Sequence, residues 1–98
     1  MASSRGPHGG HDLPEFEWDE WNEEKLLRRH GVSAWEAEKC FANPHTKRRS
    51  GSAMLMLGVT DSGRMLLLAY AQKARSVRVY SAREMTQNER RTYRRLAR

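Results

Sequence analysis

The sequence has one cysteine, few aromatic residues and no long apolar run. A single thiol, Cys40, cannot form an intramolecular disulfide, and no metal-ligand spacing surrounds it, so we interpret it as a small buried side chain in a reducing compartment. No segment approaches the roughly 18 apolar residues of a membrane-spanning helix, and the N-terminus lacks the apolar region of a signal peptide. We therefore expect a cytoplasmic protein that has no membrane association.

The chain is also short, which limits what it can enclose. Its 98 residues suffice for one small domain that buries about 60% of its unfolded surface, so we expect no large internal cofactor site and predict neither a cofactor nor a metal. Residues 1–14 are small, polar and rich in Gly and Pro, a composition typical of a disordered arm. The predicted domain covers residues 15–98.

Acidic residues are scarce in the second half of the chain. Residues 1–44 carry five Lys/Arg and nine Asp/Glu, a net charge of −4, whereas residues 45–98 carry thirteen and three, a net charge of +10. Such a basic half suggests a nucleic acid or an acidic protein as partner. A solvated face with a frayed basic tail is the alternative interpretation.

The first half of the domain predicts a short strand and a helix. Residues 15–18 alternate acidic and aromatic side chains, as a short strand does. Asp19 can then cap a helix that runs to about His30, and Gly31 suits the left-handed conformation with which many helices end.

A second capping box is formed by Ser33 and Glu36 and predicts a helix that ends near Ala42. The two helices should form a hairpin that packs on one face of a sheet. Trp21 and Trp35 are most simply aromatic residues of the core or of its edge.

The second half predicts strands. Residues 45–52 are polar and basic and suit a loop or a poor edge strand, whereas residues 53–59 and 65–71 are apolar runs of strand length. The segment 61–63 between these runs is a hairpin signal, and residues 72–74 form the next turn.

The stretch from Ser76 to Arg83 predicts a last strand that leads into a helix. Val77 and Val79 point to one side of this strand, whereas Arg78 and Tyr80 point to the other. A capping box at Thr86 then begins the final helix. We therefore predict an α+β fold in the order β-α-α-β-β-β-(β)-α, in which a small antiparallel sheet carries an N-terminal helical hairpin on one face and a C-terminal helix.

Short motifs follow one another at fixed intervals between residues 16 and 93. They are Phe16-Glu17-Trp18-Asp19, His30-Gly31-Val32-Ser33, Phe41-Ala42-Asn43-Pro44, Ser81-Ala82-Arg83, and Glu89-Arg90-Arg91 with Tyr93. In this order they resemble the BrnT toxins of bacterial type II toxin–antitoxin systems. The resemblance implies a fold like that of the RelE and ParE toxins and a metal-independent ribonuclease. It also implies a ribbon-helix-helix antitoxin, BrnA-like, that masks the toxin and binds operator DNA.

Ribonuclease chemistry of this kind needs a base for the RNA 2′-hydroxyl, cations for the phosphate and an acid for the leaving oxygen. We predict that Arg78 and Arg83 clamp the phosphate, because a guanidinium can donate two parallel hydrogen bonds. His30 lies in the family's His-Gly motif and is a candidate for proton transfer, or it simply stabilises a helix C-terminus. Tyr70, at the end of the central strand, is the fourth candidate, and either orients RNA or buries its ring.

Further residues are predicted to contact RNA without taking part in cleavage. Tyr80 is included because it shares a face with Arg78. The predicted RNA-binding set is Arg48, Arg49, Lys73, Arg75 and Tyr80.

Four positions depart from the family pattern. Ser52-Ala53 stand where relatives commonly have an acidic residue followed by Arg, Arg29 stands for a Lys, and Leu26 stands for a frequent Asn. The segment before Ala53 also looks shortened, so an edge strand could be reduced or missing. The second hypothesis is therefore an attenuated, toxin-like module that acts by binding an antitoxin or operator DNA. A ribosomal or chromosomal packing protein is a third, which rests on charge alone.

Overall fold

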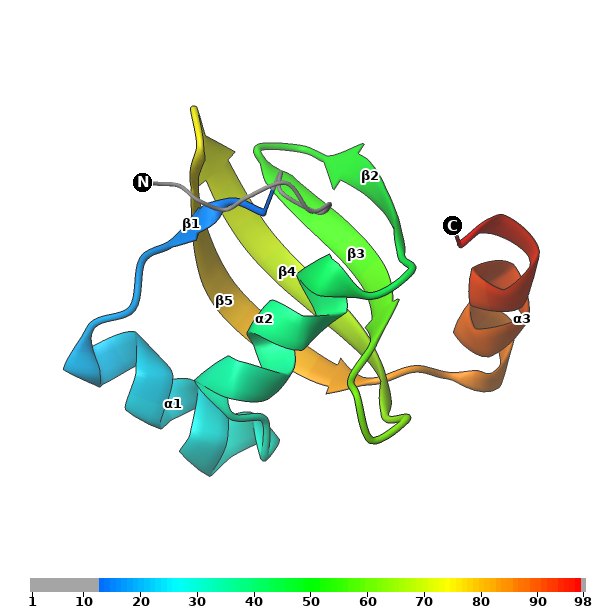
Figure 1. Ribbon diagram of the computed structural model, residues 1–98, viewed down its shortest axis with the longest axis horizontal. Coiled ribbons are helices and arrows are strands. Elements are labelled where there is room, and N and C mark those ends of the chain that lie inside the picture. Colours follow the sequence, from blue (N-terminus) through cyan, green and yellow to red (C-terminus); the bar gives the residue numbers. More distant parts are fainter. Residues whose placement is uncertain (1–12, 98) are drawn as a thin grey trace, which may run out of the picture.

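The computed structural model describes residues 13–97, which form three helices around a five-stranded sheet (Figure 1). The predicted N-terminal arm therefore lies almost entirely outside the described residues. Within residues 13–97, no helix is long and apolar enough to cross a membrane. The elements in chain order are β1 (Glu15–Phe16), α1 (Glu20–His30), α2 (Ala34–Ala42), β2 (Thr46–Ser50), β3 (Ala53–Val59), β4 (Met65–Lys73), β5 (Ser76–Glu84) and α3 (Gln87–Leu96).

The sheet is mixed, whereas the sequence predicted an antiparallel one. Its strand order is β1-β5-β4-β3-β2, and β2 to β5 pair with their chain neighbours in antiparallel fashion. β1 is parallel to β5, with Glu15 opposite Ser76 and Phe16 opposite Val77. Two helices and three strands separate these partners in the chain, so no hairpin turn dictates their relative direction.

The basic segment before Ala53 forms an edge strand of the sheet, so the alternatives of a loop or a missing strand are wrong. β2 pairs with β3 from Thr46 opposite Leu57 to Ser50 opposite Ala53. Gly51, at φ +63°, provides the left-handed residue of the tight turn between them. Four strands therefore lie between α2 and α3, and the observed order is β-α-α-β-β-β-β-α.

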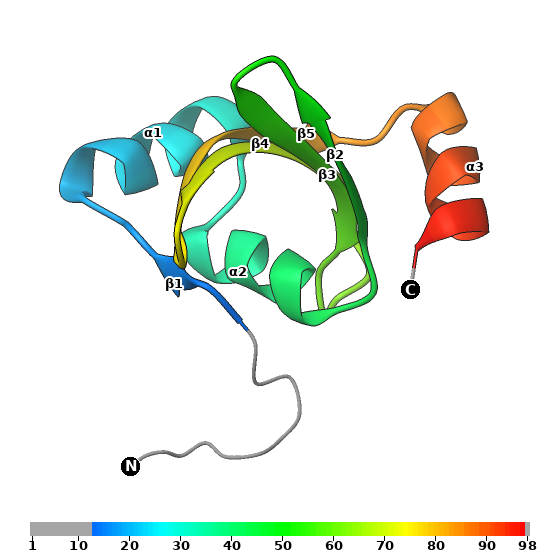
Figure 2. The same ribbon diagram turned by 90° about the horizontal axis from the view of Figure 1, so that it is seen from above.

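The sheet curves strongly, and Figure 2 shows α2 inside the curve and α3 outside it, beside β2 and β3. We call the concave side the inner face and the convex side the outer face. Val77 and Val79 lie in the core, as predicted. The inner-face residues Met56, Leu66, Leu68, Tyr70, Val77 and Val79 pack with residues of α2 and with Leu26 and Val32 in one cluster.

The two N-terminal helices do not cover the same face of the sheet. α2 lies on the inner face, whereas α1 is next to β5 (Figures 1 and 2). Because β1 pairs with only the first two residues of β5, most of the β5 edge would otherwise be open. The Asn22 side chain donates a hydrogen bond of 3.4 Å to the Val79 carbonyl at this edge.

Two tryptophans expected in or near the core lie in solvent instead. Trp21 is 73% exposed and Trp35 is 63% exposed, because their helix positions point away from the sheet. The ammonium group of Lys39 lies 4.3 Å from the ring centre of Trp35, in a cation–π contact. The indole that packs against the core is that of Trp18, which donates a 2.7 Å hydrogen bond to Glu38.

α2 approaches β3 most closely at Cys40 and Gly58. Cys40 is fully buried, as predicted, and burial raises the pKa of its thiol to about 12. A Cβ atom on Gly58 would lie 2.9 Å from the Cβ of Cys40 and 3.3 Å from its carbonyl oxygen. The helix can therefore rest on the strand only because residue 58 has no side chain.

We predict that Gly58→Ala lowers the free energy of unfolding by about 1–3 kcal/mol, because the added methyl group overpacks this contact. Urea denaturation of the two proteins measures the difference. Removing the opposing Cβ in Cys40→Gly should relieve the clash, so the double variant should lose less stability than the sum of the single variants. Additive losses would show that this contact does not limit the packing.

Candidate functional site

The outer face of β5 carries both arginines that the sequence selected as a phosphate clamp. Residues five positions apart lie on opposite faces of a regular strand, because side chains alternate. Here Ala69 pairs with Ser81 and Tyr70 pairs with Val79, which leaves Tyr80 as an extra residue in a β-bulge. The bulge shifts the alternation by one residue, and Arg78 and Arg83 consequently face the same side of the sheet.

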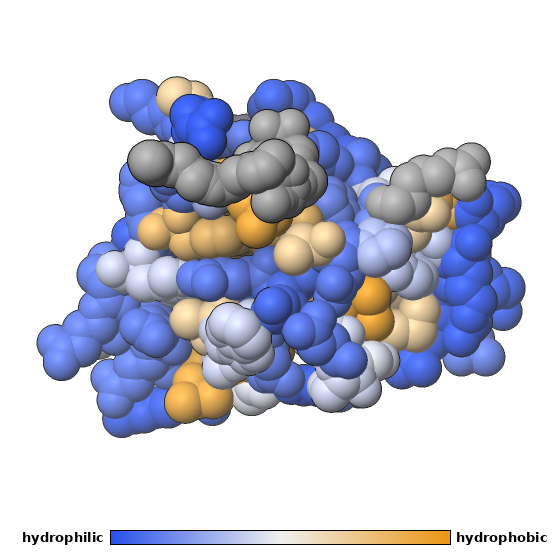
Figure 3. All heavy atoms as spheres, viewed as in Figure 1, coloured by the Kyte–Doolittle hydropathy of each residue, from blue (hydrophilic) through white to orange (hydrophobic). Residues whose placement is uncertain are grey.

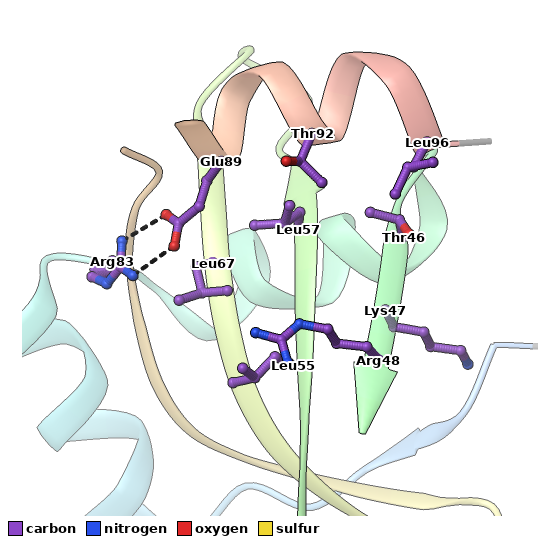
Figure 4. A pocket seen from close by; sticks show the side chains of 10 residues that line it. All are labelled: Thr46, Lys47, Arg48, Leu55, Leu57, Leu67, Arg83, Glu89, Thr92 and Leu96. Atoms are coloured by element: carbon purple, nitrogen blue, oxygen red, sulfur yellow. Dashed lines mark hydrogen bonds and ion pairs between the residues drawn. The ribbon is translucent and has the colours of Figure 1, made fainter. Parts of the chain in front are cut away.

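A groove with a volume of about 420 Å³ separates the outer face from α3 (Figure 4). Figure 3 shows apolar surface exposed between the sheet and α3, flanked by the hydrophilic side of that helix. Basic and polar side chains frame this apolar floor. The floor consists of Leu55, Leu57 and Leu67, the wall of Thr92 and Leu96, and the basic rim of Lys47, Arg48 and Arg83.

The helix beside the groove is held mainly by polar contacts, since none of its residues in the described range is fully buried. The Tyr93 hydroxyl donates a 2.9 Å hydrogen bond to the Pro44 carbonyl. At the other end of the helix, Glu89 contacts Arg83 on β5.

The contact between Arg83 and Glu89 is a bidentate ion pair. Two guanidinium nitrogens of Arg83 each donate a 2.8 Å hydrogen bond to the carboxylate of Glu89. The same carboxylate also accepts the backbone N–H of Thr86 in the capping box. These hydrogen bonds, Arg83 first, lower the pKa of Glu89 to about 2. Glu89 is therefore ionised at neutral pH and poorly suited as a general base.

Arg78 is paired in a similar way with the cap of the first helix. It donates a 2.7 Å hydrogen bond to Asp19. The backbone N–H of Asn22, and then Arg78, lower the pKa of this carboxyl group. Both clamp arginines thus carry a carboxylate partner, and each partner also caps a helix. The sequence identified the capping roles but not these two ion pairs.

His30 ends α1 at a corner that is tied to the end of β5. Arg64 donates a 3.0 Å hydrogen bond to the carbonyl of Gly31 and also forms ion pairs with Glu36 and Glu84, at 2.9 and 3.4 Å. His30 precedes Gly31, and Arg83 precedes Glu84. The Arg64 network therefore brings the chain segments of these two candidates to the same end of the molecule.

Tyr70 lies on the other side of the sheet from the clamp. Its side chain is fully buried on the inner face, with its ring centre 5.0 Å from that of Phe41. Its hydroxyl has no hydrogen-bond partner within residues 13–97, and burial raises its pKa. The structure does not bring Tyr70 to the groove, because the inward alternation of β4 commits it to the core.

The predicted RNA-binding residues are spread over two regions. Arg48 lies at the groove, whereas Arg49 pairs with the inward-facing Met54. Lys73 and Arg75 flank the turn between β4 and β5. Tyr80 is the bulge residue and is 51% exposed.

Three polar residues that line the groove were not predicted from the sequence, namely Thr46 and Lys47 of β2 and Thr92 of α3. Thr46 lies two positions before Arg48 in β2, so strand alternation could have placed these two side chains on one face. Across residues 13–97, no three His, Cys, Asp or Glu side chains are grouped as a metal site would require.

The comparisons with known proteins agree with the motif resemblance. A family model described as the ribonuclease toxin BrnT of type II toxin–antitoxin systems matches residues 18–89, which include β3 to β5 and the first turn of α3. A comparison with curated proteins finds no match.

We predict that Glu89→Gln lowers the melting temperature at pH 7 by roughly 4–8 °C, because the half-exposed ion pair and the cap together contribute about 1 kcal/mol. The folded-state pKa of Glu89 lies below its ordinary value of 4.5, so this contribution is present above pH 4.5 and is lost as the pH falls toward 2. Melting curves at several pH values should show the two proteins converging over this range.

Glu24→Gln is the matched control, since Glu24 forms only an exposed 3.7 Å pair with Arg28. It should leave the melting temperature nearly unchanged. A constant gap between the wild type and Glu89→Gln down to pH 2 would contradict the assigned pKa.

We predict that Tyr70→Phe keeps or raises the free energy of unfolding, because it removes a buried hydroxyl that lacks a partner. Tyr93→Phe, the same chemical change where the hydroxyl bonds to Pro44, should cost about 0.5–1.5 kcal/mol. Urea denaturation of both variants provides the comparison. A larger loss in Tyr70→Phe than in Tyr93→Phe would mean that the buried hydroxyl does have a partner.

Proposed function

Because the chain belongs to the BrnT family of ribonuclease toxins of type II toxin–antitoxin systems, we propose that it cleaves RNA in the cytoplasm by metal-independent attack of a 2′-hydroxyl. The observation that carries this proposal is the bulge at Tyr80, since it places Arg78 and Arg83 on the face that borders the groove. We include in the proposal a fold shared with the RelE and ParE toxins.

In the proposed reaction, an RNA phosphodiester lies at the basic rim of the groove. The 2′-oxygen attacks the adjacent phosphorus as its proton is removed, a 2′,3′-cyclic phosphate forms, and the 5′-oxygen leaves with a proton. Arg83 and Arg48 stabilise the dianionic phosphorus centre from the rim. His30 is the proposed proton carrier, and Arg78 holds a neighbouring phosphate.

The ion pairs of the clamp determine how RNA would enter. Two guanidinium nitrogens of Arg83 donate hydrogen bonds to Glu89. A phosphate must therefore displace Glu89 or bind the remaining N–H groups of Arg83. The side chain of Arg48 extends from β2 across β3 toward Leu55 and makes no ion pair within the described residues (Figure 4). Arg48 is therefore a cation of the rim to which a phosphate can bind without displacing a carboxylate.

The partner implied by the family is an antitoxin. We propose a ribbon-helix-helix protein with an acidic segment that covers the basic half of this chain, and operator DNA contacted through that antitoxin. The outward side of α3 supports this choice, because it carries the exposed arginines Arg91, Arg94 and Arg95.

The alternative function is an attenuated module that binds an antitoxin without cleaving RNA. Two observations favour it: both clamp arginines already hold carboxylates, and the turn at Ser52-Ala53 lacks the arginine that relatives commonly have there. The two functions differ in whether Arg83 is needed for RNA cleavage.

We predict that the wild type degrades RNA in the presence of EDTA and stops growth when expressed alone, and that Arg83→Ala lowers cleavage by about 100-fold or more. Arg28→Ala is the matched control, because it removes an exposed arginine of α1 that does not line the groove. Incubation of total RNA with each purified protein measures cleavage. Coexpression of the neighbouring small gene should restore growth.

Intact RNA and normal growth with a correctly folded wild type would overturn the ribonuclease proposal and leave the binding module. Equal losses in Arg83→Ala and Arg28→Ala would remove Arg83 from the site. Circular dichroism of each variant establishes that it is folded.

A further inference from the structure

A second cavity, of about 320 Å³, lies beyond the groove on the inner side of β2. Its polar lining comes from β2, from the end of β4 and from the turn that follows β4. This volume is at the lower end of the roughly 300–1,000 Å³ typical of ligand pockets. The side chains of His45, Lys47, Gln72 and Arg75 line it, with Phe41 beside them, and we call it the His45 pocket.

The ring of His45 has a defined tautomer. Its Nδ1 lies 2.8 Å from the carbonyl oxygen of Asn43, which can only accept a hydrogen bond. Nδ1 therefore carries the proton, and in the neutral ring Nε2 is an acceptor. The ring of His45 also lies near that of Phe41, with ring centres 6.4 Å apart. The hydrogen bond to Asn43 and the contact with Phe41 together fix its orientation.

The two cations of the pocket are available to an anion. Neither Lys47 nor Arg75 forms an ion pair with any carboxylate in residues 13–97, in contrast to Arg78 and Arg83. They come from separate elements, β2 and the β4–β5 turn, and converge on one cavity. A phosphate diester between them would balance charges that the described part of the chain leaves uncompensated.

Lys47 connects the pocket with the groove, because the residue lines both, and its pairing with the inner-face Met56 turns its side chain to the side of the pocket. Figure 4 shows Arg48 reaching across β3 while Lys47 points away from that strand. β2 is the last strand of the sheet, and residues 47–50 are exposed. A single strand of RNA can therefore pass from the outer face around this edge to the inner side and meet a cation at each step.

We propose that the His45 pocket is a second RNA subsite, which binds a nucleotide next to those in the groove. Its phosphodiester lies between Lys47 and Arg75, and an N–H group of the base donates to Nε2 of His45. This inference rests on the proposed function, because it takes RNA as the substrate. In addition, the enzyme would bind several nucleotides of one RNA strand that passes around the β2 edge. Binding would not be limited to the two nucleotides at the cleavage site.

The test compares Lys47→Gln/Arg75→Gln with Lys25→Gln/Arg28→Gln, which removes the same charge from α1. Binding is measured by fluorescence anisotropy with a 2′-O-methyl RNA of roughly eight nucleotides, which spans both regions and cannot be cleaved. We expect the pocket variant to bind about tenfold more weakly and the slope of log K against log salt to fall by about 0.7 for each phosphate that the variant no longer binds. The control variant should bind like the wild type.

Cleavage of two substrates distinguishes this inference from the proposed function. The single variant Arg75→Gln, at a residue that lines the pocket but not the groove, should lose about tenfold in kcat/KM with the longer RNA and much less with a dinucleotide, whereas Arg83→Ala should lose activity on both. Equal binding losses in the pocket and control variants, or no loss in either, would overturn the subsite even if the wild type cleaves RNA. Loss of binding in the pocket variant alone, with a wild type that cleaves nothing, would support the subsite and overturn the nuclease.

Discussion

The β-bulge at Tyr80 determines which side chains of β5 meet on one face of the sheet. Before the bulge, Val77 and Val79 enter the core, and after it Ala82 does so, although an uninterrupted alternation would have turned Ala82 outward. Without the extra residue, either Arg83 would point into the apolar core or the second half of the strand would lose its packing. The basic outer face and the inner core therefore depend on the same local irregularity.

The carboxylates that hold the clamp arginines connect local and long-range structure. Asp19 and Glu89 each satisfy backbone N–H groups at the start of a helix, and each also forms an ion pair with an arginine of β5. A capping residue has its carboxylate fixed by the helix, so it presents a positioned anion at little additional cost in side-chain entropy. These ion pairs link α1 and α3 to β5, and α1 is held in addition by the packing of Leu26 in the core.

Local signals in the sequence predicted much of the fold, and the features they missed depend on distant partners. The capping boxes, the β3–β4 hairpin and the inward side of Val77 follow from neighbouring residues, and all are confirmed. The parallel pairing of β1 has no local signal. Tyr70 belongs to an apolar run without alternation, so the sequence did not indicate which face of the sheet its side chain occupies. Arg78 was predicted correctly to point away from the core, whereas the face of Arg83 depends on the bulge, which has no signal in the sequence. The carboxylate partners of Arg78 and Arg83 lie 59 and 6 positions away, and only the first of these pairs requires the folded chain to be recognised.

The shared use of Glu89 has a thermodynamic consequence for the end of the chain. α3 is fastened to the rest of the molecule by the Arg83–Glu89 pair near its start and by the Tyr93 hydroxyl further along, with little buried apolar surface to assist. An anion that displaces Glu89 from Arg83 removes one of these two contacts. By linkage, if anion binding at Arg83 weakens the packing of α3 on the sheet by some factor, the packing of α3 weakens anion binding by the same factor. The last helix and the anion are thus competing ligands of a single guanidinium group.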